Sequence, residues 1–154
     1  MMKPLVLIAA LATLVVAGSA SSRPSGCAPL LLLPRATPAG QFVLFGHIRS
    51  LTRKGAGFEL RFDPALWLTG VTASRAKLED EGSSDVPNDY YIRDPDHRLL
   101  TYKVPATAPV TVLARGTCTT RTTAAVLARS HPRAGFWIRV RIDTVRSLDQ
   151  QFQP

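Results

Sequence analysis

The chain has 154 residues, of which 45% are hydrophobic and 19% are charged, and its formal net charge is +8. This size and composition fit one globular domain, require no second domain and exclude a largely disordered chain. Seven of the eleven acidic residues lie between Glu79 and Asp96, whereas nine basic residues and one acidic residue lie between Arg98 and Arg146. The basic residues are not interleaved with aromatic ones, which argues against nucleic acid as a partner.

The first twenty residues have the layout of an export signal. Lys3 precedes an apolar run from Leu5 to Val16, and small residues follow this run. The run is shorter than the ~20 residues that span a bilayer, and the whole pattern is typical of a cleaved signal peptide. The sequence therefore predicts a secreted or extracytoplasmic protein with a signal peptide over 1–20, a flexible Pro/Ala-rich arm over 21–40 and a single α+β domain over 41–154.

The two cysteines, Cys27 and Cys118, can pair in an oxidising compartment. We predict one disulfide, which would tie the N-terminal arm to the domain and stabilise it by about 4 to 5 kcal/mol in the chain-entropy model. The alternative is lipidation of Cys27, because Ser25 and Gly26 before it match the end of a bacterial lipoprotein cleavage box. Pro24 weighs against this alternative, and membrane association is expected only if Cys27 is lipidated.

The domain begins with two predicted strands. Residues 41–51 are rich in β-branched and aromatic side chains, and the turn 53–57 leads to the alternating segment Phe58–Phe62. This pattern predicts a hairpin with Phe58, Leu60 and Phe62 pointing inward. Asp63 and Pro64 predict the end of the second strand and the start of a short helical turn over 65–68.

The rest of the chain alternates helix and strand patterns. A helix is expected over 71–80, ended by Gly82, with Val71, Ala73 or Ser74, and Leu78 buried. A loop over 83–96 contains a short strand, and Thr120–Ser130 fits either helix or strand. Further strands are expected over 99–104, 110–113, 136–140 and 144–148, the last two forming a hairpin around Ile142 and Asp143. We predict an α+β fold with a small antiparallel sheet or a partly open β-barrel and one or two short helices.

Several motifs along this domain form a recognisable series: Phe62-Asp63, then Ala65-Leu66-Trp67-Leu68-Thr69-Gly70, then Val86-Pro87-Asn88-Asp89-Tyr90-Tyr91-Ile92, then Leu99-Leu100-Thr101. The series resembles a group of uncharacterised exported proteins of Gram-positive bacteria, many of them actinobacterial. The end of the chain from Phe136 is similar to the terminal hairpin of that group, although Ile142-Asp143 replaces the expected turn glycine. The resemblance covers roughly residues 45–154, and it implies export but no activity.

An acidic cluster lies before and within the Asn-Asp-Tyr-Tyr motif. It consists of Glu79, Asp80, Glu81, Asp85, Asn88 and Asp89. Oxygen ligands of this kind suit Ca²⁺, but the spacing matches no EF-hand loop. The alternative interpretation is that Asn88 and Asp89 fold the loop through hydrogen bonds to the backbone. We therefore predict neither a metal site nor a cofactor.

The chain contains no strong catalytic signature. The candidates for acid, base or nucleophile are His47, His97, His131, Asp89, Tyr90 and Tyr91. A nucleophile elbow, a His-Glu-x-x-His zinc motif and a P-loop are all missing from the sequence. Each histidine is interpreted as a core or surface residue, and we assign no catalytic residue.

The neighbours Tyr90 and Tyr91 should face opposite sides of a strand, one ring buried and the other exposed. An exposed tyrosine beside Asn88 and Asp89 suits a contact with a ligand or partner. We therefore predict a non-enzymatic, monomeric, exported domain that binds an envelope or extracellular partner through Asn88, Asp89, Tyr90 and Tyr91. The alternatives are a small hydrolase or metal-dependent enzyme using Asp89, Glu79 and a histidine, and an accessory or inhibitor protein of another secreted enzyme.

Overall fold

The computed structural model describes residues 36–115, 118–130 and 133–153. The predicted signal peptide, most of the predicted arm, Cys27 and His131 lie outside these residues. Within the described part, no helix is long and apolar enough to cross a membrane. The elements in chain order are β1 (Phe42–Lys54), β2 (Gly57–Thr69), α1 (Gly70–Glu81), β3 (Tyr90–Arg93), β4 (Leu100–Pro105), β5 (Val110–Arg115), β6 (Cys118–Thr122), α2 (Ala124–Ser130), β7 (Gly135–Arg141) and β8 (Thr144–Gln150).

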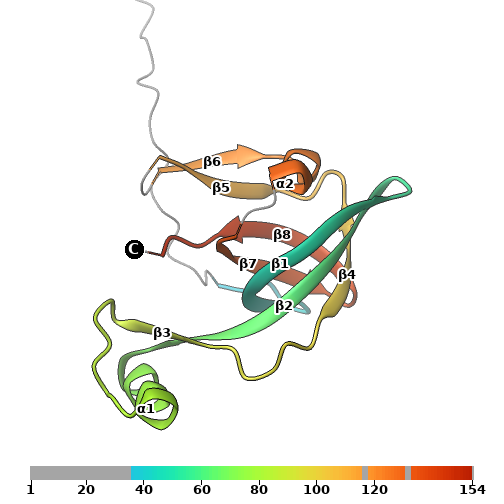
Figure 1. The fold of residues 1–154 in the computed structure, drawn as a ribbon. Coiled ribbons are helices and arrows are strands. Elements are labelled where there is room, and N and C mark those ends of the chain that lie inside the picture. The colour runs from blue at the N-terminus through green and yellow to red at the C-terminus, as the bar shows by residue number, and fades with distance from the viewer. Residues whose placement is uncertain (1–35, 116–117, 131–132, 154) are drawn as a thin grey trace, which may run out of the picture.

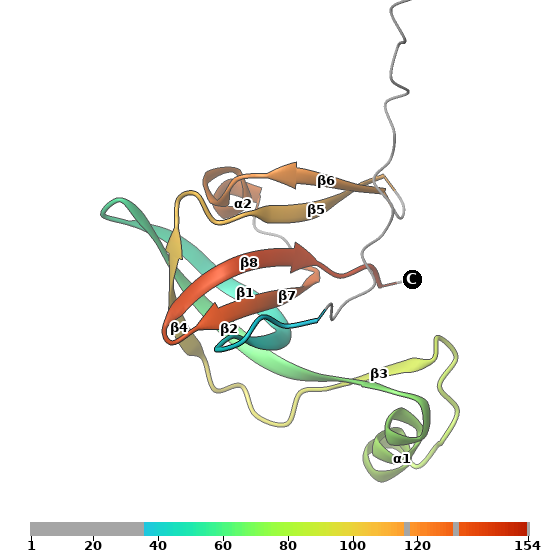
Figure 2. The same ribbon diagram turned by 180° about the vertical axis from the view of Figure 1, so that it is seen from behind.

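The fold is a sheet-rich α+β arrangement in which one sheet contains eight strands. The strand pairings form a closed cycle: β1 pairs with β2, β2 with β4, β4 with β8, β8 with β7, and β7 with β1. The contact that completes the cycle is one parallel pair, Lys103 with Thr144. Figures 1 and 2 show β5, β6 and α2 at one end of this cycle and β3 and α1 at the other.

The predicted small antiparallel sheet is wrong in two respects. The sheet is larger than predicted, and it is mixed because β8 runs parallel to both β4 and β5. Parallel strands need a long connection between them, and here β6, α2 and β7 lie between β5 and β8 in the chain. Sequence reasoning considered only neighbours joined by short turns, so it missed these pairings.

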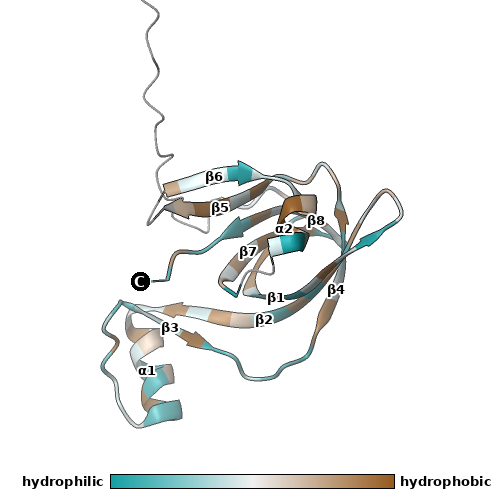
Figure 3. Cartoon of the chain, turned by 45° about the horizontal axis from the view of Figure 1, so that its top comes forward, coloured by the Kyte–Doolittle hydropathy of each residue, from teal (hydrophilic) through white to brown (hydrophobic). Residues whose placement is uncertain are grey.

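The main core fills the inside of the cycle. Phe58, Leu60 and Phe62 are buried as the alternation of β2 predicts, and α2 contributes Ala124 and Leu127. Bands of hydrophobic and hydrophilic residues alternate along β2 in Figure 3. A second, smaller cluster lies on the other face of the same strands and contains Phe45, Ala65 and Trp137.

The predicted helical turn over 65–68 is wrong, because β2 continues through Asp63 and Pro64 to Thr69. The pairing of β2 with β4 ends at Phe62, and the pairing with β3 begins at Leu66. Pro64 therefore lies in a short stretch where one edge of β2 has no partner strand, and a residue without an N–H is tolerated there. On the other edge Pro64 pairs with Gly46.

Helix α1 confirms the predicted helix, its end and the burial of Ala73, but the predicted burial of Val71 and Leu78 is wrong. Gly82 adopts a left-handed φ of 74° and donates its N–H to the carbonyl of Leu78 at 3.0 Å. The helix buries Ala73 and Ala76, whereas Val71 and Leu78 are exposed. Small residues face inward because α1 lies close against β2 and β3 rather than over the main core.

Candidate functional site

The Asn88–Tyr91 segment, which the sequence singles out for binding, forms a turn followed by strand β3. The N–H of Asp89 donates to the carbonyl of Val86 at 3.1 Å, and Asp89 adopts a left-handed φ of 57°. Asparagine and aspartate tolerate this conformation better than most residues. The turn itself therefore explains the aspartate, while a binding role for exposed Asn88 and Asp89 stays a prediction.

Tyr90 and Tyr91 face opposite sides of β3, as predicted, but both rings are half-buried. The ring of Tyr90 stacks on Trp67 with centroids 4.1 Å apart. The hydroxyl of Tyr91 donates to Asp80 of α1 at 3.2 Å. Both tyrosines thus have partners within the protein, which accounts for them without an external ligand.

The acidic residues of α1 pair with Arg93 of β3. Arg93 donates from Nε to Asp80 at 2.8 Å and from Nη2 to Glu79 at 3.0 Å. These hydrogen bonds lower the pKa of Asp80, and partial burial together with the bond to Asp80 raises the pKa of Tyr91. We call Glu79, Asp80, Tyr91 and Arg93 the helix lock. It joins α1 to β3, and it engages Glu79 and Asp80, two of the six residues that the sequence offered as calcium ligands.

A second polar cluster was not predicted and lies around Asp63. The side chain of Asp63 is fully buried, and its Oδ2 accepts hydrogen bonds from Nε and Nη2 of Arg49 at 2.8 and 2.5 Å. The Nδ1 atom of His97 lies 3.7 Å from the same oxygen and 3.3 Å from Oδ2 of Asp94. The Oδ1 atoms of both aspartates are buried and have no hydrogen-bond partner. We call Asp63, Asp94 and His97 the buried-aspartate cluster.

This cluster shares only a histidine, His97, with the candidates for the predicted hydrolase. Among the described residues, it is the group of three His, Cys, Asp or Glu side chains whose ligand atoms lie within 4.8 Å of one another, and neither Glu79 nor Asp89 belongs to it. Sequence reasoning missed Asp63 because the Asp-Pro pair was interpreted as a helix start. A continued alternation through Ala65 and Trp67 was the signal that could have kept Asp63 in a strand.

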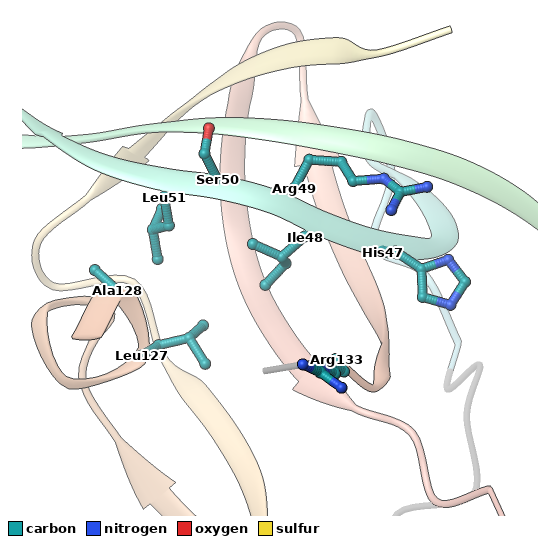
Figure 4. Close-up of a pocket in the computed structure, with 8 residues that line it drawn as sticks. All are labelled: His47, Ile48, Arg49, Ser50, Leu51, Leu127, Ala128 and Arg133. Carbon is teal, nitrogen blue, oxygen red and sulfur yellow. The ribbon is translucent and has the colours of Figure 1, made fainter. Parts of the chain in front are cut away.

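A first hollow of about 460 Å³ lies between β1 and α2 (Figure 4). Ile48 and Leu51 of β1 and Leu127 of α2 project into it, while His47 and Arg49 lie toward one side. Arg133 lines the hollow as well. The guanidinium of the other lining arginine, Arg49, is already bound to Asp63. The hollow therefore has an apolar floor, and its polar lining consists of His47, Arg49, Ser50 and Arg133.

A second hollow of about 520 Å³ lies over β2 and β4 and reaches two turns. Lys54 and Gly57 line it at the β1–β2 turn, and Asp143 and Thr144 line it at the β7–β8 turn. We call it the barrel-face hollow. Glu59, Thr101, Tyr102 and Lys103 contribute from the strands between these turns.

Two ion pairs border the barrel-face hollow. Lys54 pairs with Glu59, and Nζ of Lys103 lies 2.7 Å from Oδ2 of Asp143. The second pair raises the pKa of Lys103 and lowers the pKa of Asp143, chiefly through the hydrogen bond between them. The N–H of Lys103 also donates to the carbonyl of Asp143 at 2.9 Å, so β4 is fixed to the β7–β8 turn.

Cys118 begins β6 and is half-buried. Its predicted partner, Cys27, lies outside the described residues, so the disulfide stays a prediction. The described part thus offers the two hollows above, a smaller one of about 260 Å³ lined by residues of β5, β6, α2 and β8, the helix lock and the buried-aspartate cluster. In the comparisons with known proteins, neither a family model nor a curated protein nor a solved structure matches the chain.

Proposed function

We propose that the chain is an exported, non-enzymatic domain that binds a polar glycan of the cell envelope in the barrel-face hollow. The observation that carries the proposal is the position of this hollow: it lies on β2 and β4 and is bounded by the β1–β2 and β7–β8 turns. The export signal predicted over residues 1–20 supports the location.

The strand order supports a barrel of a type that is common among binding proteins. The cycle β1–β2–β4–β8–β7, with α2 between its third and fourth strands, is the order of a partly open OB-type barrel. In such barrels, oligosaccharides and oligonucleotides bind on the second and third strands and on the turns at either side. The barrel-face hollow occupies this position. Fold analogy alone does not establish function, so the lining chemistry must agree.

The charged residues that line the hollow favour a neutral ligand. Its two lysines are balanced by Glu59 and Asp143, so the lining selects neither an anion nor a cation. Together with Thr101 and Thr144, these side chains offer many donors and acceptors. Sugar hydroxyl groups are both donors and acceptors, so they can pair with either kind of group.

Single-stranded nucleic acid fits this face less well. Such ligands need a basic groove with aromatic side chains on which successive bases stack. Glu59 and Arg61 of β2 are paired in register with Lys103 and Thr101 of β4, which gives this part of the face alternating charge and no stacking surface. The proposal of a glycan ligand therefore agrees with the sequence-based expectation of no nucleic acid.

Binding is tested by calorimetry on the mature chain with a neutral, β-linked wall oligosaccharide, and with single-stranded DNA as the competing ligand. We expect saturable binding of the oligosaccharide, and we expect Lys103→Ala and Thr101→Ala to weaken it about tenfold, equivalent to about 1.4 kcal/mol. Arg146→Ala is the matched control, because Arg146 is exposed on β8 and does not line the hollow.

Amide chemical shifts locate the ligand independently of affinity. We expect the largest changes at Glu59, Thr101 and Lys103. Changes centred on Asn88 and Asp89 would instead support the loop as the contact site. Tighter binding of DNA than of the oligosaccharide, or an equal loss of affinity in the Arg146 control, would refute the proposed function.

A further inference from the structure

We propose that Asp63, Asp94 and His97 form a binding site for a divalent transition-metal cation, with Zn²⁺ as the best-matched ion. This inference goes beyond the proposed function and does not depend on it. The three residues come from separate places: Asp63 lies within β2, whereas Asp94 and His97 lie in the segment after β3. Their ligand atoms lie within 4.8 Å of one another.

The unpartnered oxygens are the first argument for a bound cation. The Asp63 side chain is completely buried, yet its Oδ1 has no hydrogen-bond partner. The Oδ1 of Asp94 is also buried without a partner. A buried carboxylate oxygen without a partner carries a large desolvation cost, and a protein usually satisfies it with a donor or a cation. Both aspartates of the cluster therefore keep an oxygen that can accept a cation, in addition to the Oδ2 atoms that lie near His97.

The spacing of the ligand atoms is the second argument. Atoms that bind a tetrahedral Zn²⁺ at about 2.0 to 2.2 Å lie roughly 3.3 to 3.6 Å from one another. The Nδ1 atom of His97 lies 3.3 Å from Asp94 Oδ2 and 3.7 Å from Asp63 Oδ2. Both separations are close to those of zinc ligands, and the remaining pair of ligand atoms lies within 4.8 Å.

The ligand types distinguish among the possible cations. Imidazole suits zinc and its neighbours in the first transition row, whereas Ca²⁺ and Mg²⁺ prefer oxygen ligands alone. One histidine and two carboxylates therefore favour Zn²⁺, with Mn²⁺ weaker. The side chain of His97 is 75% exposed, so water can complete the coordination and the ion can enter from solvent.

Arg49 is the competing cation in this site. Its guanidinium bonds to Asp63 Oδ2, the oxygen nearest to His97. A metal ion on this carboxylate is repelled by the guanidinium at short range, so the two cations oppose each other's binding. Half of the Arg49 side chain is exposed, and it can swing toward solvent when a metal binds.

The test is calorimetric titration of the tag-free mature chain with Zn²⁺, and separately with Mn²⁺ and Ca²⁺. We expect one Zn²⁺ per chain, weaker binding of Mn²⁺ and no competition from Ca²⁺. Asp94→Asn and His97→Ala should each weaken Zn²⁺ binding at least tenfold. Both residues are partly or largely exposed, so these variants are expected to stay folded.

Asp96→Asn is the matched control, because it removes the same charge two residues away from Asp94 and lies outside the cluster. It should bind Zn²⁺ like the unmodified chain. The ring signals of His97 in NMR spectra should shift on addition of one equivalent of Zn²⁺, which reports the ligand directly. The absence of saturable Zn²⁺ binding, equal affinity of the Asp94 and Asp96 variants, or tighter binding of Ca²⁺ would each overturn the proposal.

Discussion

The molecule contains two clusters in which an arginine binds carboxylates, and they differ in how fully the carboxylate oxygens are satisfied. In the helix lock, Arg93 bonds to both oxygens of Asp80 and to Glu79, and the Tyr91 hydroxyl adds a further donor. In the buried-aspartate cluster, Arg49 bonds to one oxygen of Asp63 and leaves the other without a partner.

Burial makes this difference important. Ion pairs at the surface contribute little because water screens them, whereas a buried carboxylate depends on every partner it has. The helix lock satisfies both oxygens of its partly exposed Asp80, so it is explained as a structural attachment of α1. In the buried-aspartate cluster, the fully buried Asp63 keeps an oxygen without a partner beside the exposed His97, so the cluster retains capacity for a ligand. Two clusters with similar numbers of charged residues thus differ in role: the helix lock is structural, and the buried-aspartate cluster is a candidate metal site.

The largest expected effect is the loss of Arg49. Arg49→Ala removes the guanidinium from a fully buried carboxylate, and we expect a loss of about 3 kcal/mol in the free energy of unfolding. The paired measurement is Arg93→Ala, which should cost much less because its partners are exposed. Urea unfolding monitored by tryptophan fluorescence gives both values. Equal losses would contradict the distinction between the two clusters.

The backbone around Asp63 should tolerate less change than the backbone of the helix lock. A Cβ added at Gly46 would lie 2.1 Å from the carbonyl oxygen of Asp63 and 2.8 Å from Cα of Pro64. Since both are backbone atoms, Gly46→Ala should cost about 2 kcal/mol.

Gly82 at the end of α1 is the comparison for Gly46. A Cβ at Gly82 meets no atom within 4 Å, so Gly82→Ala should cost only the strain of its left-handed φ, about 1 kcal/mol. Thermal unfolding of the two variants gives the order directly. A Gly82 variant less stable than the Gly46 variant would show that β1 and β2 can separate without cost.

A third comparison measures how the arginine of each cluster affects Zn²⁺ affinity. If Arg49 and the metal compete for Asp63, Arg49→Gln should bind Zn²⁺ about tenfold more tightly than the unmodified chain. At saturating Zn²⁺ this difference adds about 1.4 kcal/mol to the stabilisation of the variant. Arg93→Gln serves as the control and should leave Zn²⁺ binding unchanged. Weaker binding by the Arg49 variant would mean that Arg49 supports the ligands rather than competing with the metal.

Local patterns predicted much of the fold. Features that depend only on residues close together in the chain can be predicted from the sequence. They include the alternation in Phe58–Phe62, the glycine that ends α1 and the apolar segments of β7 and β8. Parallel pairing of β8 with β4 and β5 depends on residues far apart in the chain, and no local pattern reports it.

The candidate site was harder to predict for the same reason. Asp63 is separated by about thirty positions from Asp94 and His97 in the sequence. The three residues meet where the partner strand of β2 changes from β4 to β3. The acidic stretch from Glu79 to Asp89 drew attention because its charges are adjacent in sequence. In the fold, Glu79 and Asp80 are bound to Arg93 instead. A high density of acidic residues along the chain thus did not identify the residues that can bind a ligand.

The smallest expected effect concerns the pKa of Asp80. The hydrogen bond from Arg93 lowers this pKa below its ordinary value of 3.8 in the folded protein. The helix lock therefore stabilises the fold fully above pH 3.8, and its contribution is lost as the pH falls through the lowered value. NMR titration should show that the Asp80 pKa rises toward 3.8 in Arg93→Gln. The stability of this variant should also fall less in acid than that of the unmodified chain, because the contribution of the lock is already absent. An Asp80 pKa already at 3.8 in the unmodified chain would mean that the lock is open in solution, and the packing of buried Ala73 and Ala76 would then hold α1 without it.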